Sequence, residues 1–297
     1  MSTTRRRTFG IQTIQHWTWE ETRDRWAWFD ELGFDSLWLT DHFVRTAKPE
    51  SPYFESWTLL SALAMVAPNP RIGVLVSSNT FRHPSLLAKQ AVTLDHISGG
   101  RLELGLGAGW FRPEHEMFGL DFPKTGELVD RYEEAIDMLD RYFRNDVTTF
   151  EGAFYSLKEA PNRPSTVQQP RPPFVLGAHQ PRMLRIAARY ADTWNSRGTV
   201  DEIRERNARL TDECVMADRD PSDIKRSLLY VIAHTPEERP WDSIDAFEDY
   251  VGRYAEAGIE DFIFQPPEPE QLPILERIAT DVIPGLAGTS LEKSELA

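Results

Sequence analysis

The sequence contains a single cysteine, Cys214, among 297 residues. One thiol excludes an intrachain disulfide and a thiolate metal cluster, and such cysteine usage is typical of a reducing cytoplasm. No segment approaches the roughly 18 consecutive apolar residues of a membrane span. The arginines at 5–7 are not followed by the apolar segment that an export signal needs. We therefore expect a cytoplasmic protein without a membrane partner.

Basic residues are also scarce. The chain has 33 lysines and arginines against 47 aspartates and glutamates, which gives a formal net charge of −14. This balance excludes nucleic acid and anionic membranes as general partners, because both repel an acidic surface. An anionic small molecule would need a local basic site.

What is present is a regular alternation of segments. Apolar runs of strand length are followed by segments with the periodicity of helices. The predicted strands cover 8–14, 34–43, 71–80, 101–109, 173–178, 192–198, 224–235 and 259–267. The predicted helices cover 18–33, 53–67, 83–100, 126–143, 181–191, 201–217, 242–257 and 270–286.

Eight strand–helix units in one chain predict an α/β fold, a single (β/α)8 TIM barrel spanning 1–297. Most strands are near-continuous apolar runs, as in parallel strands that are buried on both faces. Extra segments follow the fourth strand and precede the fifth, and they include a hairpin predicted at 147–157. We expect 1–7 and 287–297 to be flexible tails.

The stretch RLELGLGAGWFRPEHEMFG carries three alternating glycines, Gly105, Gly107 and Gly109. A dinucleotide-binding turn would require a glycine where Trp110 stands, followed at once by a helix. Two helix-breaking residues, Pro113 and Gly119, argue against a helix there. Glycines within a strand more often mark a bulge or the close approach of a ligand.

In a TIM barrel the chemistry lies at the carboxyl ends of the strands. The residues predicted at these ends are Asp41, His42, Ser77 to Thr80, Ala108 to Trp110, Gly177 to His179, Asn195 to Arg197, His234 and Gln265. His42 is the foremost catalytic candidate, because histidine exchanges protons near neutral pH. His83 precedes a proline and is better explained as a helix cap. The turn at 177–182, with Arg182 in the following helix, suits a phosphate.

Other chemistries find less support. Glu114, His115 and Glu116 lack the spacing of a metal site, so no metal is expected. A serine hydrolase would need a G-x-S-x-G elbow, which is absent. A glycosidase would need two carboxylates at the strand ends, where Asp41 stands alone.

Several of these segments together resemble the luciferase-like flavin- and deazaflavin-dependent oxidoreductases, in particular the F420-dependent group. The matching segments are 32–43, 79–110, 111–123 and 185–195, and the resemblance extends over essentially the whole chain. It implies a barrel of the bacterial-luciferase type with a deazaflavin or flavin ring at the strand ends, and a cis peptide at Leu75–Val76. The alternating glycines would then let a strand approach the cofactor.

The resemblance also implies roles for individual residues. His42 would be the catalytic residue near the reactive face of the ring. Cofactor binding is implied for Asp41, Leu75, Val76, Asn79, Ala108, Gly109, Trp110, Glu114, Gly177, Ala178 and His179.

The sequence departs from its relatives in two places. A run of glycines common after the fifth strand is replaced by residues 177–180, of which His179 and Gln180 are large. The acidic residue of some F420-dependent sugar-phosphate dehydrogenases is replaced by Trp110. We therefore expect an apolar or aromatic small-molecule substrate rather than a sugar phosphate.

Three functions follow as hypotheses. The first is an F420-dependent oxidoreductase, with Arg45, Arg112, Arg182 and Arg197 as candidates for a groove that holds the anionic tail. The second is an FMN-dependent monooxygenase supplied by a separate reductase. The third is a cofactor-binding protein without turnover. In each case relatives suggest a homodimer formed through the helices beside the second and third strands.

Overall fold

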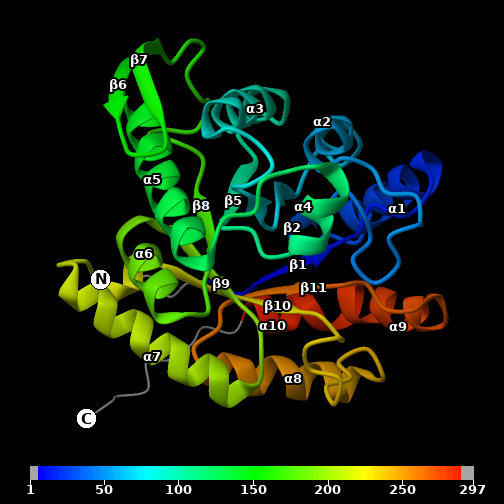
Figure 1. Ribbon diagram of the computed structural model, residues 1–297. Coiled ribbons are helices and arrows are strands. Elements are labelled where there is room, and N and C mark those ends of the chain that lie inside the picture. The colour runs from blue at the N-terminus through cyan, green and yellow to red at the C-terminus, as the bar shows by residue number, and fades with distance from the viewer. Residues whose placement is uncertain (1–5, 289–297) are drawn as a thin grey trace.

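Residues 6–288 are described by the structure, a computed structural model (Figure 1). Nine parallel strands form one sheet in the order β3-β2-β1-β11-β10-β9-β8-β5-β4, and a further pairing of β3 with β5 closes it. β3 and β4 are successive parts of one interrupted barrel strand, and we call this pair the stave β3–β4. The closed sheet is therefore an eight-stranded barrel, and the predicted TIM barrel is confirmed. The strands are β1 (Thr8–Gln12), β2 (Ser36–Leu39), β3 (Arg71–Val74), β4 (Ser77–Ser78), β5 (Leu102–Gly107), β8 (Phe174–Gly177), β9 (Thr193–Ser196), β10 (Lys225–Tyr230) and β11 (Asp261–Phe264).

Helices surround the barrel (Figure 1). The α-helices are α1 (Trp19–Glu31), α2 (Ser56–Val66), α3 (Pro84–Ile97), α4 (Arg112–Phe118), α5 (Thr125–Arg144), α6 (Pro181–Tyr190), α7 (Val200–Met216), α8 (Ile244–Glu256), α9 (Leu272–Arg277) and α10 (Ile283–Gly288). Thr18 and Glu21 form a capping box at the start of α1, and Thr199 and Glu202 form a second one at the start of α7. No helix within 6–288 is long and apolar enough to cross a bilayer.

Several predicted boundaries need correction. The single strand expected at 71–80 is divided into β3 and β4 by the cis peptide at Leu75–Val76, which is present as the resemblance implied. The single helix expected at 270–286 consists of a 3-10 turn, α9, a π-turn at Ile278–Val282 and α10. Pro284 lacks a backbone N–H and cannot continue a regular ladder, and the wider π-turn precedes it. Most residues of the expected tails lie outside the described part of the chain.

The segment after the glycine motif is helical, contrary to the prediction. Pro113 stands in the first turn of α4, where its missing N–H would have had no partner within the helix. Gly119 does not disrupt α4 but ends it, with the positive φ of 66° that favours glycine. The two residues that argued against a helix are therefore its start and stop signals.

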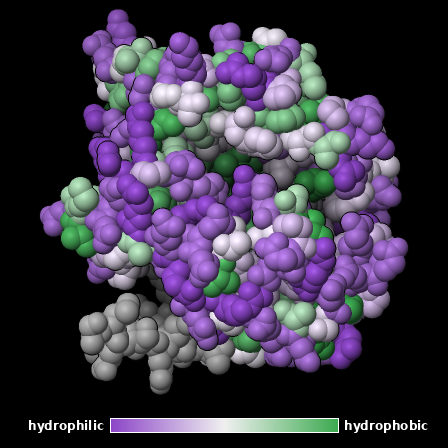
Figure 2. Space-filling view, turned by 60° about the horizontal axis from the view of Figure 1, so that its bottom comes forward, coloured by the Kyte–Doolittle hydropathy of each residue, from purple (hydrophilic) through white to green (hydrophobic). Residues whose placement is uncertain are grey.

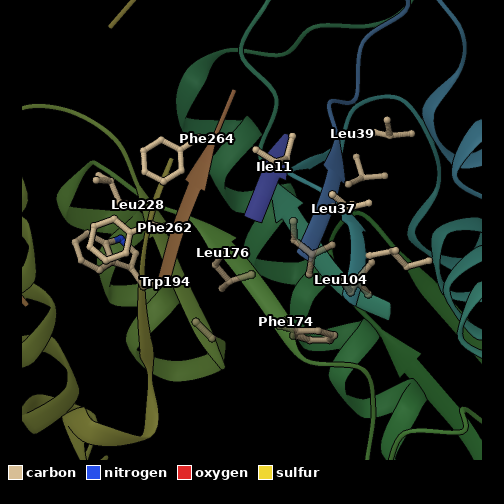
Figure 3. Close-up of a cluster of buried hydrophobic side chains, with 14 of the residues drawn as sticks. Ile11, Leu37, Leu39, Leu104, Phe174, Leu176, Trp194, Leu228, Phe262 and Phe264 are labelled. Carbon is tan, nitrogen blue, oxygen red and sulfur yellow. The ribbon is translucent and has the colours of Figure 1, made fainter. Parts of the chain in front are cut away.

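Side chains from alternate strand positions form two separate apolar layers. Figure 3 shows the layer between the strands and the helices, to which Ile11, Leu37, Leu39, Leu104, Phe174, Leu176, Trp194, Leu228, Phe262 and Phe264 belong. The neighbouring positions point the other way and fill the barrel interior with Trp38, Leu75, Val175, Leu229 and Ile263. Burial on both faces explains why the strand sequences were apolar without alternation.

A polar network fills the amino-terminal end of the barrel. Asp261 at the start of β11 pairs with Lys225 at 3.0 Å and accepts a hydrogen bond from Ser227 at 2.6 Å. Asn195 donates in turn to Ser227 at 2.9 Å. Since these groups occupy the interior at that end, the opposite, carboxyl end is the face on which a ligand can enter.

The insertion between β5 and β8 carries the predicted hairpin, β6 (Val147–Glu151) and β7 (Ser156–Pro161), which pair antiparallel. Figure 1 shows it beside α5. The carboxylate of Glu134 on α5 accepts the backbone N–H groups of Ala153, Phe154 and Tyr155 at 2.7–2.8 Å. Three hydrogen bonds to one ionised group fix the hairpin turn against the helix.

Candidate active site at the carboxyl ends of the barrel strands

His42 lies beyond the end of β2 and is held by Glu114 of α4. Its Nδ1 is 2.8 Å from Oε2 of Glu114, a carboxylate that is fully buried. The other carboxylate oxygen accepts the backbone N–H groups of Phe43 and Val44. An ionised carboxylate only accepts hydrogen bonds, so Nδ1 carries the hydrogen and Nε2 is left for a ligand. The resemblance assigned Glu114 to the cofactor, and the structure shows that it orients His42.

Aromatic rings stand beside His42. The Trp110 ring lies 5.8 Å from the imidazole at an interplanar angle of 87°, and Phe111 lies 6.3 Å away at 81°. Trp110 is 62% exposed although it is one of the largest apolar side chains of the chain. An exposed indole beside a hydrogen-bonded histidine–carboxylate pair is a surface suited to a flat or apolar ligand.

Asp41 is fully engaged by the protein. Its carboxylate accepts two hydrogen bonds from the Arg82 guanidinium at 2.6 and 2.9 Å, one from Ser56 Oγ at 2.7 Å and one from the Ser78 backbone at 2.7 Å. Burial by itself lowers the pKa of Arg82, but the hydrogen bonds and charges of Asp41 and Glu55 more than offset it and the pKa is raised. Asp41 thus ties the end of β2 to β4, to α2 and to the turn that precedes α3.

Arg82 lies in the candidate site but was not predicted from the sequence, which drew attention to the adjacent His83 instead. The prediction for His83 is confirmed, since its Nδ1 accepts the Ser85 N–H at 3.1 Å as the cap of α3. An arginine four residues beyond the end of a strand carries no periodic signal. Only the proximity of a buried carboxylate such as Asp41 marks it.

The alternating glycines allow β5 to lie against the interrupted stave β3–β4. A Cβ atom on Gly105 would lie 2.0 Å from the carbonyl oxygen of Val74, and one on Gly107 would lie 2.5 Å from Cγ2 of Val76. A Cβ on Gly177, from the other side, would meet Cγ1 of Val76 at 3.5 Å. The expectation that Gly105 and Gly107 make room for a cofactor therefore needs correction: they make room for the neighbouring strand.

Asn79 and Thr80 follow β4 and line a cavity of about 280 Å³. The other lining residues are Arg82, His83, Asp121, Pro123, Leu128, Arg131 and Tyr155. Tyr155 comes from the hairpin turn, and its hydroxyl accepts Nδ2 of Asn79 at 3.1 Å. Sequence reasoning missed Tyr155, because 76 residues separate it from Asn79 and nothing in the pattern links them.

His115 and Glu114 are both committed to internal hydrogen bonds. Nε2 of His115 lies 2.6 Å from Thr80 Oγ1, and Nδ1 lies 2.9 Å from the carbonyl oxygen of Phe111. The carbonyl can only accept, so Nδ1 is the donor and Nε2 accepts the threonine hydroxyl. Within the described part of the chain, no group of three or more histidine, cysteine or carboxylate side chains is arranged to hold a metal.

The turn after β8 brings Gly177, Ala178 and His179 to the mouth. Nδ1 of His179 is 3.1 Å from Ser196 Oγ, and the carbonyl of Ala178 accepts the indole N–H of Trp194 at 2.8 Å. Burial, and then the charge of Arg197, lower the pKa of His179 to about 4. Its imidazole is therefore neutral at pH 7.

The arginines predicted for an anionic ligand divide into two groups. Arg182 is paired with Asp130 at 2.5 Å and with Glu133 at 3.3 Å, so its charge is already compensated and its predicted role at the turn needs correction. Arg45, Arg112 and Arg197 have no carboxylate within ion-pair distance among residues 6–288, although Arg112 lies over the Phe122 ring at 4.6 Å. Figure 2 shows a hollow with hydrophobic residues in its depth and hydrophilic residues around it.

A closed (β/α)8 barrel with a histidine–carboxylate pair, an aromatic wall and uncompensated cations at its carboxyl end defines a class of barrel proteins that handle a small ligand at the mouth. The sequence model of the luciferase-like monooxygenases matches residues 3–271, and the chain belongs to this family. The predicted resemblance is thereby confirmed.

Comparisons with individual proteins agree with this assignment. The chain is 32% identical over 166 residues to an F420-dependent glucose-6-phosphate dehydrogenase of Microbacterium testaceum. That match covers 55% of this chain and 48% of the relative, so the chain spans about half the relative's length.

Two solved structures show the same fold. An F420-dependent secondary alcohol dehydrogenase in complex with an F420–acetone adduct superimposes with a TM-score of 0.81 at 17% identity, covering 93% of this chain and 99% of the other. The monooxygenase RslO1 from Streptomyces bottropensis superimposes with a TM-score of 0.75 at 19% identity, covering 94% and 99%.

Proposed function

We propose that the protein is an F420-dependent oxidoreductase that acts on a small organic molecule. The observation that carries the proposal is the His42–Glu114 pair, with Nε2 of His42 left for a ligand beside the exposed Trp110. The glucose-6-phosphate dehydrogenase relative and the structurally similar alcohol dehydrogenase are both F420-dependent, which supports the choice of cofactor. We further propose that 1–297 form one barrel domain and that the protein acts in the cytoplasm.

The residues at the mouth fit such a cofactor. A flat ring needs an apolar support, which Val76 and Val231 offer because they pack on the apolar interior of the barrel. An anionic tail needs cations that are not already paired, and Arg45, Arg112 and Arg197 meet this condition within the described residues. Asn79 and the turn at 177–179 add hydrogen-bonding groups.

When bound, the reduced deazaflavin supplies the hydride. The chain itself positions the acceptor and manages the proton. Nε2 of His42 donates a proton to the substrate oxygen or accepts one from it, according to the direction of transfer. Glu114 holds the imidazole ring of His42 in place and stabilises it when it is protonated. Trp110 and Phe111 contact the substrate and exclude water, which favours an apolar or aromatic substrate over a sugar phosphate.

The test is a fluorescence titration of the purified protein with oxidised F420 and with FMN at matched salt. We expect FMN to bind at least about tenfold more weakly, a difference of about 1.4 kcal/mol. His42→Ala should leave the affinity for F420 within about threefold and abolish substrate-dependent oxidation of reduced F420. Preferential binding of FMN would contradict the proposal.

A second function is favoured by the family itself. An FMN-dependent monooxygenase, supplied with reduced flavin by a separate reductase, is consistent with the fold that the chain shares with RslO1. Oxygen consumption with FMN and a reductase would support it. A protein that binds F420 or FMN tightly but never turns over with any acceptor would instead be a binding protein.

We also propose a homodimer formed through α2 and α3. Three large apolar side chains, Met65 on α2 with Leu86 and Ile97 on α3, are exposed on these adjacent helices. Light scattering after size-exclusion chromatography should give twice the chain mass of 34.1 kDa. Met65→Glu should shift it toward the monomer, whereas a monomeric wild type would contradict the proposal.

A further inference from the structure

Arg197, His179 and His234 follow the carboxyl ends of three neighbouring strands. β8 pairs with β9, and β9 pairs with β10. Arg197 comes directly after β9, His179 lies two residues after β8, and His234 lies four residues after β10. The 3.1 Å contact of His179 Nδ1 with Ser196 Oγ joins the first two turns. Arg197 acts electrostatically on both histidines, and His234 acts on His179, so the three side chains form one cluster at the mouth.

The cluster holds a positive charge that the protein does not compensate. Arg206 donates to the carbonyl oxygen of Arg197 at 2.6 Å, and its own guanidinium pairs with Glu202 at 3.2 Å. Arg197 has no such partner among residues 6–288, and burial together with Arg206 lowers its pKa. A half-buried cation without a counter-ion is costly, so an anion bound there would stabilise the protein.

Both imidazoles of the cluster are suited to donate to an anion. Burial and then Arg197 lower the pKa values of His179 and of His234, so each ring is neutral near pH 7 and has one N–H group. The titratable groups that act on His179 are Arg197, Arg206, His234 and Glu202, of which Arg206 and Glu202 pair with each other.

The position of the cluster relative to His42 defines what it can hold. In the order β3-β2-β1-β11-β10-β9-β8-β5-β4, four steps separate β2 from β9 in either direction around the closed sheet. His42 and Arg197 follow these two strands and thus lie across the mouth from each other. One ligand, or a cofactor and substrate side by side, could reach both.

We propose that Arg197, His179 and His234 bind a carboxylate or phosphate group whose carrier has its reactive part beside His42. The guanidinium provides two parallel N–H donors and each imidazole one. The inference rests on the proposed function only for the identity of the carrier, which is either the substrate or the tail of the cofactor. If it is the substrate, the substrate class is an apolar or aromatic compound that bears an anionic group.

The first experiment uses inorganic phosphate as the probe with the full chain in the absence of cofactor. Histidine imidazoles labelled with ¹⁵N report binding by NMR, and His179→Gln assigns the His179 signal. We expect saturable binding of phosphate with an upward shift of the His179 pKa, because a bound anion favours the imidazolium.

Variants separate the cluster from general charge effects. Arg197→Gln should weaken phosphate binding at least about tenfold, which corresponds to one charge-assisted contact. Arg204→Gln is the matched control, because Arg204 is an exposed arginine paired with Asp201 on α7 and loses the same charge. The phosphate affinity of Arg197→Lys should lie between those of Arg197→Gln and Arg204→Gln. Circular dichroism verifies that each variant is folded. Phosphate binding that is absent, or equal in Arg197→Gln and Arg204→Gln, would overturn the inference.

A competition experiment then distinguishes the carriers. If F420 displaces phosphate, the anion belongs to the cofactor. If phosphate binds equally well to the F420-saturated protein, the site serves the substrate. A protein that binds phosphate through Arg197 but does not bind F420 would retain this site while contradicting the proposed function.

Discussion

Replacing Gly105 by alanine tests whether the glycine repeat serves the barrel wall. The new Cβ would lie 2.0 Å from the carbonyl oxygen of Val74, whereas ordinary contacts begin at 3.4 Å, so β3 and β5 would have to separate by 3.4 − 2.0 = 1.4 Å. The obstacle is backbone and cannot rotate away. Overpacking of a tight interior costs about 1–3 kcal/mol and occasionally more. We expect Gly105→Ala to lower the free energy of unfolding by about 3 kcal/mol or more.

Urea denaturation followed by circular dichroism and tryptophan fluorescence measures this loss. The matched control is Gly126→Ala in the first turn of α5, where a Cβ meets nothing within 4 Å. Alanine is the better helix former, so this control should leave stability unchanged or raise it by up to about 1 kcal/mol. If the two variants differ by less than about 0.5 kcal/mol, the steric role of Gly105 is refuted.

Three further outcomes are expected. Glu114→Gln should lower the free energy of unfolding, measured by urea denaturation, by about 2–4 kcal/mol and slow the oxidation of reduced F420. The glutamine side chain has only one oxygen and cannot accept hydrogen bonds from both His42 and the backbone. Turnover at the wild-type rate would contradict this prediction. Asp41→Asn should lower the free energy of unfolding by about 3–5 kcal/mol, because the buried Arg82 guanidinium loses its main counter-ion and keeps only the contact with Glu55 at 3.3 Å; a smaller loss than in Glu114→Gln would be unexpected. The pKa of His179 is lowered from 6.5 to about 4, so the unfolded chain takes up the proton first as the pH falls. Stability should thus drop by up to about 3 kcal/mol from pH 6.5 to 4, less so in His179→Gln.

The barrel could be predicted from the sequence because buried parallel strands are continuous apolar runs, whereas the covering helices have apolar residues at helical spacing. The two kinds of segment can therefore be told apart along the chain. The rule that chemistry lies at carboxyl strand ends then placed His42, Trp110 and His179 at one mouth, although these residues are far apart in the chain. The cis peptide at Leu75–Val76 came from the resemblance alone, since no local pattern announces it.

What the sequence did not predict are contacts made by side chains from distant segments. The pairing of Asp41 with Arg82 and the hydrogen bond from Asn79 to Tyr155 depend on how loops fold back, which periodicity does not encode. The helix α4 was missed for a different reason. Pro113 and Gly119 are breakers in a helix interior but normal residues at its two ends, and their meaning depends on a boundary that is known only from the structure.

The closure of the barrel has a consequence for its synthesis. β1 is bordered by β2 on one side and by β11 on the other, so its second edge waits for the last strand of the chain. At about 5–20 residues per second, ribosomes need about 13–50 s to proceed from Gln12 to Phe264. During that interval the edge of β1 that will later pair with β11 has unpaired backbone N–H and C=O groups. Such an edge is a template for association with other chains. We expect nascent chains that end before Asp261 to depend on chaperones and to aggregate without them.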